Sequence, residues 1–191
     1  MVREGLLSIF KEKFVKQTIK NMKHQAGMTL MELIAGLAIL AAVVVGALSL
    51  FGNANSSQNS TQMLKDLTAV RSAVSSLYMG QGGYGAVSLN QTLITANKIP
   101  ATMTVSGTNI NTALGGTLTV TGNTSNFTMA ITNVPADVCT SLLTNASTGW
   151  SSVKVGASPA ITTFPVSPAV ATDAAQCGGT APFTITWTTI N

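Results

Sequence analysis

The chain has 191 residues, of which 46% are hydrophobic and only 8% are charged. This length suits one main folded domain with a modest core, and the composition fits neither a typical cytosolic enzyme nor a disordered tail. The net charge of +4 lies entirely before Met28, because four basic and four acidic residues balance from Met28 onward. A basic patch for nucleic acid is therefore not expected on the folded part.

The first 27 residues form a basic leader, and an apolar run from Met28 to Phe51 follows, with Glu32 as its one ionisable side chain. As a helix, this run would span about 36 Å, enough to cross a bilayer core of about 30 Å. The basic side chains before it predict a cytoplasmic N-terminus, with the remainder outside. A secretory signal would have a shorter apolar core followed by its small-residue cleavage site, whereas here Ala26–Gly27 precedes the run.

The stretch GMTLMEL, which begins at Gly27, places a glycine, an apolar residue and a glutamate in the order of a prepilin processing site. It resembles the type IV pilins. The long basic leader and Met28 as first mature residue are more similar to the type IVb branch. The resemblance implies that a prepilin peptidase cuts between Gly27 and Met28 and methylates the new amino group. Glycine suits this position physically, because a backbone without a side chain can enter a narrow protease cleft.

A carboxylate in hydrocarbon is costly unless it is paired or reaches water, so Glu32 is expected to have a function. One interpretation is that it reaches the lipid headgroups or interacts favourably with the dipole at the start of the helix. The resemblance implies another role, in filament assembly: Glu32 pairs with the N-terminal ammonium of a neighbouring copy. Two charges buried in a filament core each need a partner, and such a pair would fix the axial register of the helices.

Apolar residues recur at steps of four and three between Met63 and Leu77, which is a helical stripe. The sequence therefore predicts one long helix from Met28 to about Met79. Its first part, 28–52, is the membrane-spanning and filament-core helix, and its second part, 53–79, is the amphipathic helix of the head.

A connecting loop is predicted over 80–116, with one short helix at LNQTLITANKI. The loop begins with the helix breakers of GQGGYG. Within the long helix, the glycines and the Asn/Ser-rich stretch over 46–57 form a weak zone, which is the expected place of any melting in a filament.

Residues 117–191 are predicted to form an antiparallel sheet, because apolar residues and threonines alternate in GTLTVTGNTSNFTMAITNV and in FTITWTT. The first stretch indicates a hairpin and the second a final strand. A short helix is expected at VPADVCTSLL, with Pro135 near its start. The predicted fold class is α+β, with the amphipathic part of the long helix covering the apolar face of the sheet.

Both cysteines, Cys139 and Cys177, follow the apolar run. If that run carries the C-terminal part out of the cytosol, a disulfide is the natural interpretation, and two buried free thiols are the alternative. The resemblance to pilins implies the same disulfide. It would bound a largely irregular loop, 139–177, exposed on the surface of a fibre.

No combination of residues predicts an enzyme, a metal site or a cofactor. The only histidine, His24, lies in the leader, so cleavage would leave no histidine for a catalytic dyad or a metal. The carboxylates after Met28 are dispersed, and no phosphate-binding glycine motif followed by lysine occurs.

The leading hypothesis is a major structural subunit that polymerises into an extracellular type IVb pilus used for adhesion, aggregation or conjugation. The resemblance implies other copies of the chain, a prepilin peptidase, an inner-membrane assembly platform and an ATPase motor as partners. Before assembly, the chain would sit in the inner membrane with its head in the periplasm. The alternatives are a minor pilin or tip adhesin, a type II secretion pseudopilin, and a signal-anchored protein that is never cleaved.

Overall fold

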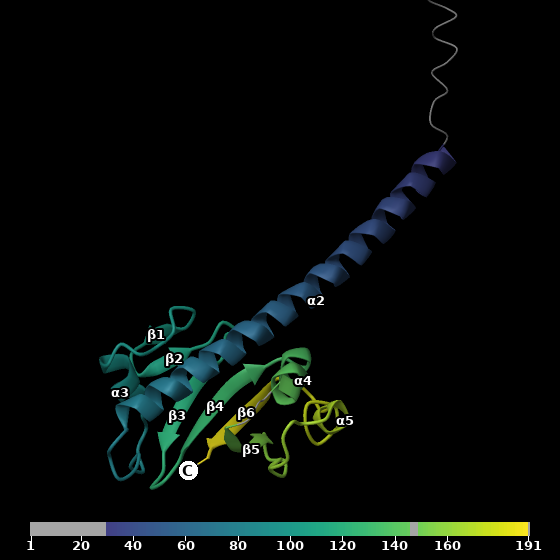
Figure 1. Cartoon of the computed structure of the whole chain (residues 1–191). Coiled ribbons are helices and arrows are strands. Elements are labelled where there is room, and N and C mark those ends of the chain that lie inside the picture. Colours follow the sequence, from purple (N-terminus) through teal and green to yellow (C-terminus); the bar gives the residue numbers. More distant parts are fainter. Residues whose placement is uncertain (1–29, 146–148, 191) are drawn as a thin grey trace, which may run out of the picture. The chain divides into compact units, whose positions relative to one another are not determined.

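The computed structural model describes residues 30–145 and 149–190, and the chain divides into two compact units between Phe51 and Gly52. Helix α2, Leu30–Leu77, has 48 residues and belongs to both units (Figure 1). The long predicted helix is therefore confirmed over the residues that the structure describes. The weak zone over 46–57 is helical in the single chain, and its melting in a filament stays a prediction.

The second unit has its core between α2 and a sheet. Met63, Leu67, Val70 and Val74 are each at most 2% exposed, as the four-three spacing of the stripe predicts. Leu77, the last residue of the helix, packs against the same core while remaining partly exposed. The amphipathic part of α2 thus forms because one of its faces is buried against the strands.

Six antiparallel strands form one sheet, in the spatial order β1-β2-β3-β4-β6-β5 (Figure 1). The strands are β1 Thr104–Ser106, β2 Asn109–Asn111, β3 Thr117–Gly122, β4 Phe127–Val134, β5 Trp150–Val155 and β6 Phe183–Thr189. The last strand of the chain therefore pairs with β4 on one side and with β5 on the other. This long-range pairing brings the end of the chain into the sheet.

The predicted hairpin is confirmed as β3 and β4. Leu118 pairs with Ile131 and Val120 with Met129, and all four side chains are fully buried. The backbone N–H of Asn123 donates to the carbonyl of Asn126 at 2.7 Å and closes the turn. Alternation places the apolar side chains toward α2 and the threonines on the opposite face. The final strand follows the same rule.

Three short helices complete the described part of the second unit. They are α3 Asn90–Thr95, α4 Ala136–Asn145 and α5 Pro168–Ala171. The buried side chain of Asn90 holds α3 on the sheet, since its amide donates to the carbonyl of Leu118 at 3.0 Å and accepts from the N–H of Val120 at 2.8 Å. The helices predicted from LNQTLITANKI and VPADVCTSLL are both present.

Two predicted segments contain more regular structure than expected. The predicted connecting loop over 80–116 contains β1 and β2, and the predicted irregular region 139–177 contains β5 and α5. Strands β1 and β2 have three residues each, and β1 has no buried side chain, so alternation gave no signal for them. In β5 a register shift between Trp150 and Ser152 interrupts the period of two.

Candidate functional site

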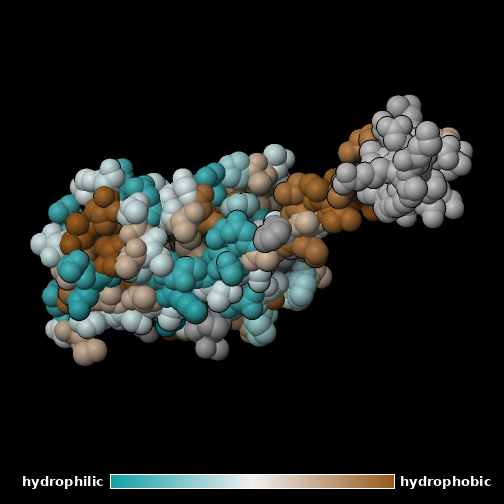
Figure 2. Space-filling view, turned by 90° about the horizontal axis from the view of Figure 1, so that it is seen from above, coloured by the Kyte–Doolittle hydropathy of each residue, from teal (hydrophilic) through white to brown (hydrophobic). Residues whose placement is uncertain are grey.

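The first unit presents an apolar surface without a cover. Every residue from 31 to 50 is exposed in the single chain, and the large hydrophobic side chains among them are 49% to 83% exposed. Figure 2 shows hydrophobic brown colour on the part of this helix that grey atoms do not cover. These large side chains are Met31, Leu33, Ile34, Leu37, Ile39, Leu40, Val43, Val44, Val45, Leu48 and Leu50. A helix that is apolar all round needs lipid or other protein around it.

Within the described residues, α2 is one helix that is long and apolar enough to cross a membrane, judged by length and composition alone. Glu32 lies in its first turn and is the one ionisable side chain between residues 31 and 50. A carboxylate at this end interacts favourably with the helix dipole. The other residues of the predicted processing site, Gly27 and Met28, lie outside the described residues.

The predicted disulfide between Cys139 and Cys177 is present in the second unit. Its two Cα atoms are 5.7 Å apart, and the cysteines are separated by 38 positions in the chain. Cys139 lies in α4, and Cys177 follows α5, with its N–H bonded to the carbonyl of Ala171. Both cysteines are buried. The bond therefore joins α4 to the segment before β6 and closes the region that contains β5 and α5.

Two carboxylates that the sequence analysis did not single out hold α2 to its surroundings. Buried Asp66 accepts hydrogen bonds from the Gln62 amide at 2.9 Å and from the Thr102 hydroxyl at 2.8 Å, which ties α2 to the segment before β1. Asp137, in the first turn of α4, accepts from the Ser56 hydroxyl. This hydrogen bond is the main reason that the pKa of Asp137 lies below its ordinary value.

A cation also connects α2 to the edge of the sheet. The guanidinium carbon of Arg71 lies 5.1 Å from the ring centre of Trp150 in β5, which is cation–π geometry. A Cβ on Gly149 would come within 2.2 Å of this guanidinium and would displace it, and the φ of +108° at this position also favours glycine. The stripe on α2 gave no signal for this contact, because Arg71 lies beside the stripe.

The described residues thus combine an exposed apolar helix, a helix-covered sheet and a disulfide-bounded region. A model of the family PilS, described as "PilS N terminal", matches residues 56–190, and the "Prokaryotic N-terminal methylation motif" matches residues 22–48. The chain belongs to the type IV pilins. The first match covers most of the chain, and the second covers the leader end, Glu32 and most of the apolar run.

Relatives of this pilin confirm the type IVb branch. It is 36% identical to the toxin coregulated pilin of Vibrio cholerae El Tor over 102 residues, 53% of this chain and 42% of that protein. It is 27% identical to the major structural subunit of the bundle-forming pilus of Escherichia coli O127:H6 over 131 residues, 66% of this chain and 67% of that one. The matched part thus spans less than half the length of the first relative.

The pilin fold is confirmed by a solved structure. The crystal structure of TcpA, a type IV pilin from Vibrio cholerae El Tor, matches with a TM-score of 0.52 and 17% identity. The match covers 70% of this chain and 99% of that one. The α+β class, with a long N-terminal helix, an antiparallel sheet and the disulfide, is therefore that of this family.

Proposed function

We propose that this pilin is the major structural subunit of an extracellular type IVb pilus. The observation that carries the proposal is the stretch of α2 from 31 to 50, in which all side chains are exposed and Glu32 is the one that ionises. Such an apolar helix is unstable in water, so when the protein leaves the membrane the helix has to move into another apolar environment. Lipid supplies the first and packed helices of other copies supply the second.

Before assembly, the helix lies in the inner membrane. The lysines and the arginine before Met28 keep the N-terminus in the cytoplasm, and the second unit folds on the periplasmic side. The periplasm permits the Cys139–Cys177 disulfide to form. A prepilin peptidase then cuts after Gly27 and leaves Met28 with a methylated, positively charged amine.

The new ammonium and Glu32 are four positions apart, or about one helical turn. When helices pack into a core without water, each of these charges needs a partner. At about 4 Å and an effective dielectric constant near 20, two opposite unit charges attract by about 4 kcal/mol. Leaving one buried member of such a pair alone costs about 3–5 kcal/mol. Pairing between neighbouring copies therefore makes one axial stagger much more stable than the others.

A contact between unlike surfaces of successive copies generates a helical filament when its rotation does not close into a ring, which is the arrangement proposed here. The second unit carries a net charge of only +1, because its four basic side chains face three acidic ones, Asp66, Asp137 and Asp173. Near neutrality limits repulsion between heads repeated along a fibre. Extraction of each helix from the bilayer requires work from an assembly platform and its ATPase motor.

The proposal is tested by Glu32→Gln in cells that carry the pilus assembly system. We expect normal membrane insertion and normal cleavage, because neither depends on the carboxylate. Sheared fibre should fall by about tenfold or more, since every 1.4 kcal/mol lost at the subunit contact is a factor of ten. Mass spectrometry of the N-terminus measures processing, and negative-stain microscopy with quantified sheared protein measures assembly.

Ser49→Ala is the matched control, since Ser49 is an exposed polar residue of the same apolar helix. It should assemble like the wild type. Abundant normal fibres from Glu32→Gln would contradict the pairing, and an intact leader on the wild-type protein would contradict the processing. Because a major subunit dominates sheared fibres on a gel, a trace amount of wild-type protein in them would indicate a minor pilin instead.

A further inference from the structure

A cleft lies at the C-terminal end of α2, and its lining residues do not belong to the buried core of the fold. Its volume is about 400 Å³, which lies within the roughly 300–1,000 Å³ of small-molecule sites. The loop after α2 lies beside the turn between β3 and β4 (Figure 1). Residues of both segments line the cleft. The lining consists of Tyr78, Gln81, Gly82, Gly83, Tyr84 and Ser125.

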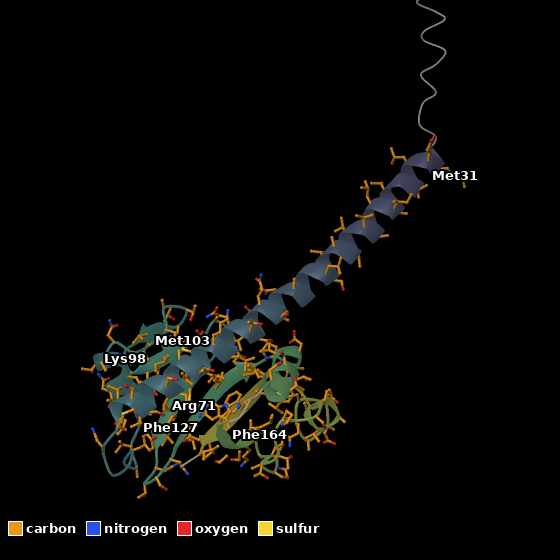
Figure 3. All side chains as sticks on the ribbon, viewed as in Figure 1. Met31, Arg71, Lys98, Met103, Phe127 and Phe164 are labelled. Carbon is orange, nitrogen blue, oxygen red and sulfur yellow. A yellow bond between two sulfur atoms is a disulfide. The ribbon has the colours of Figure 1, made fainter. Side chains whose placement is uncertain are left out.

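The two tyrosines are held in place by the core. The ring of Tyr84 meets Phe127 edge to face, with centres 4.9 Å apart, and the ring of Tyr78 lies 5.4 Å from that of Tyr84. Phe127 is fully buried at the start of β4 and is labelled in Figure 3. Both tyrosines stay partly exposed. The cleft therefore has an aromatic wall whose orientation is fixed before any ligand arrives.

Close backbone approach fixes the loop against the hairpin. A Cβ on Gly83 would lie 2.0 Å from the carbonyl oxygen of Thr124, and one on Gly122 would lie 2.4 Å from that of Gly85. Neither position can carry a larger residue without moving the loop. The N–H of Gln81 also donates to the carbonyl of Tyr78 at 3.0 Å. The glycines thus bring the aromatic wall and Ser125 to the same opening.

The chemistry of the lining selects the class of ligand. None of the lining residues is charged, so an anion or a cation would find no counter-charge there. The side chains of Tyr78, Gln81, Tyr84 and Ser125 form no hydrogen bond with other residues that the structure describes, which leaves hydroxyl and amide groups to bind a ligand. Flat aromatic faces beside neutral donors and acceptors suit a ring with C–H groups on its face and hydroxyls at its rim.

We propose that this cleft binds a neutral saccharide, with a sugar ring against the tyrosines and its hydroxyls bonded to Gln81 and Ser125. The site lies wholly within the second unit, so it goes beyond the proposed role in assembly and does not depend on it. A pilin with this site binds a sugar as a single copy, whether or not it polymerises.

The test uses the full chain in a detergent without a sugar headgroup, with carbon-13 in its tyrosine rings. The chain has only two tyrosines and both line the cleft, so each tyrosine NMR signal reports on this site. Lactose, methyl α-mannoside and N-acetylglucosamine are titrated, with N-acetylneuraminic acid as the anionic probe. We expect saturable shifts of both tyrosine signals with at least one neutral sugar, and weaker binding of the anionic one.

The double variant Gln81→Ala, Ser125→Ala should weaken that binding by about tenfold or more, since it removes two hydrogen-bonding groups while keeping the rings. Gln91→Ala is the matched control, because Gln91 is exposed on α3 and does not line the cleft, and this variant should bind like the wild type. Three results would overturn the proposal: no saturable tyrosine shift with any neutral sugar, unchanged binding by the double variant, or tyrosine shifts that follow protein concentration instead of sugar, which would place a second copy in the cleft.

Discussion

The loss of stability expected on removal of the disulfide can be calculated from the length of the loop that it closes. In the double variant Cys139→Ala, Cys177→Ala, the constraint on a loop of 38 positions is lost from the unfolded chain. A loop of this length lowers the free energy of the folded state relative to the unfolded one by about 4 kcal/mol in the chain-entropy model. Alanine keeps the two buried positions apolar, so the change acts mainly on the closed loop.

Urea unfolding of the full pilin in detergent micelles measures this change. The two tryptophans, Trp150 and Trp187, are both buried in the sheet, 8% and 1% exposed, so their fluorescence reports the unfolding of the second unit. With a slope of about 2 kcal/mol per molar urea, a loss of about 4 kcal/mol lowers the midpoint by about 2 M. Since domains are stable by only about 5–15 kcal/mol, this loss is a large fraction of the total stability.

Thr140→Ala is the control, because this residue neighbours Cys139 on α4 and its hydroxyl bonds only to the carbonyl of Ala136 within its own helix. Its midpoint should stay close to that of the wild type. If the double cysteine variant unfolded within about 0.5 M urea of the wild type, loop closure would not be the source of stability in this region.

Two further predictions concern the contacts of α2. Leu67→Ala removes a side chain that is 2% exposed between α2 and the sheet, and it should lower the free energy of unfolding by about 2–5 kcal/mol. The control is Thr68→Ala at the exposed neighbouring position, which should change that free energy by about 0.5 kcal/mol or less. Equal effects of the two substitutions would contradict the packing of this face of α2. The pKa of Asp137 is lowered in the folded state by the Ser56 hydroxyl, so its stabilising contribution is present above the unfolded value of 3.8 and is lost as the pH falls through the lower folded value. The urea midpoint should therefore fall with acidification in this range less steeply for Ser56→Ala than for the wild type, and identical pH profiles would rule out this hydrogen bond as the cause.

Long, regular patterns made most of the fold predictable. The stripe from Met63 to Leu77 identified the buried face of α2, and strict alternation identified β3, β4 and β6, because each of these elements buries one side against the same core. Strand β5 was not predicted, because its register shift places both Trp150 and Val153, which are three positions apart, in the core. Such an irregularity interrupts the alternation of buried and exposed side chains from which strands are recognised in a sequence.

Some functional features could be predicted from the sequence and others could not. Glu32 and the cysteines could be found from the sequence, because a lone carboxylate in an apolar run and a pair of cysteines beyond it are local signals. The tyrosine cleft could not be, since Tyr84 and Ser125 meet only after the hairpin folds back on the loop that follows α2. The bond of Asp66 to Thr102 likewise joins residues 36 positions apart.

The structure of the assembled fibre at side-chain resolution tests the central claim most directly. The distance to be measured joins the amino nitrogen of Met28 in one copy and the carboxylate of Glu32 in an adjacent copy. We expect the two groups within about 4 Å of each other, in a core that excludes water. Well-separated groups, each in contact with solvent, would contradict the account of why the apolar helix carries a glutamate.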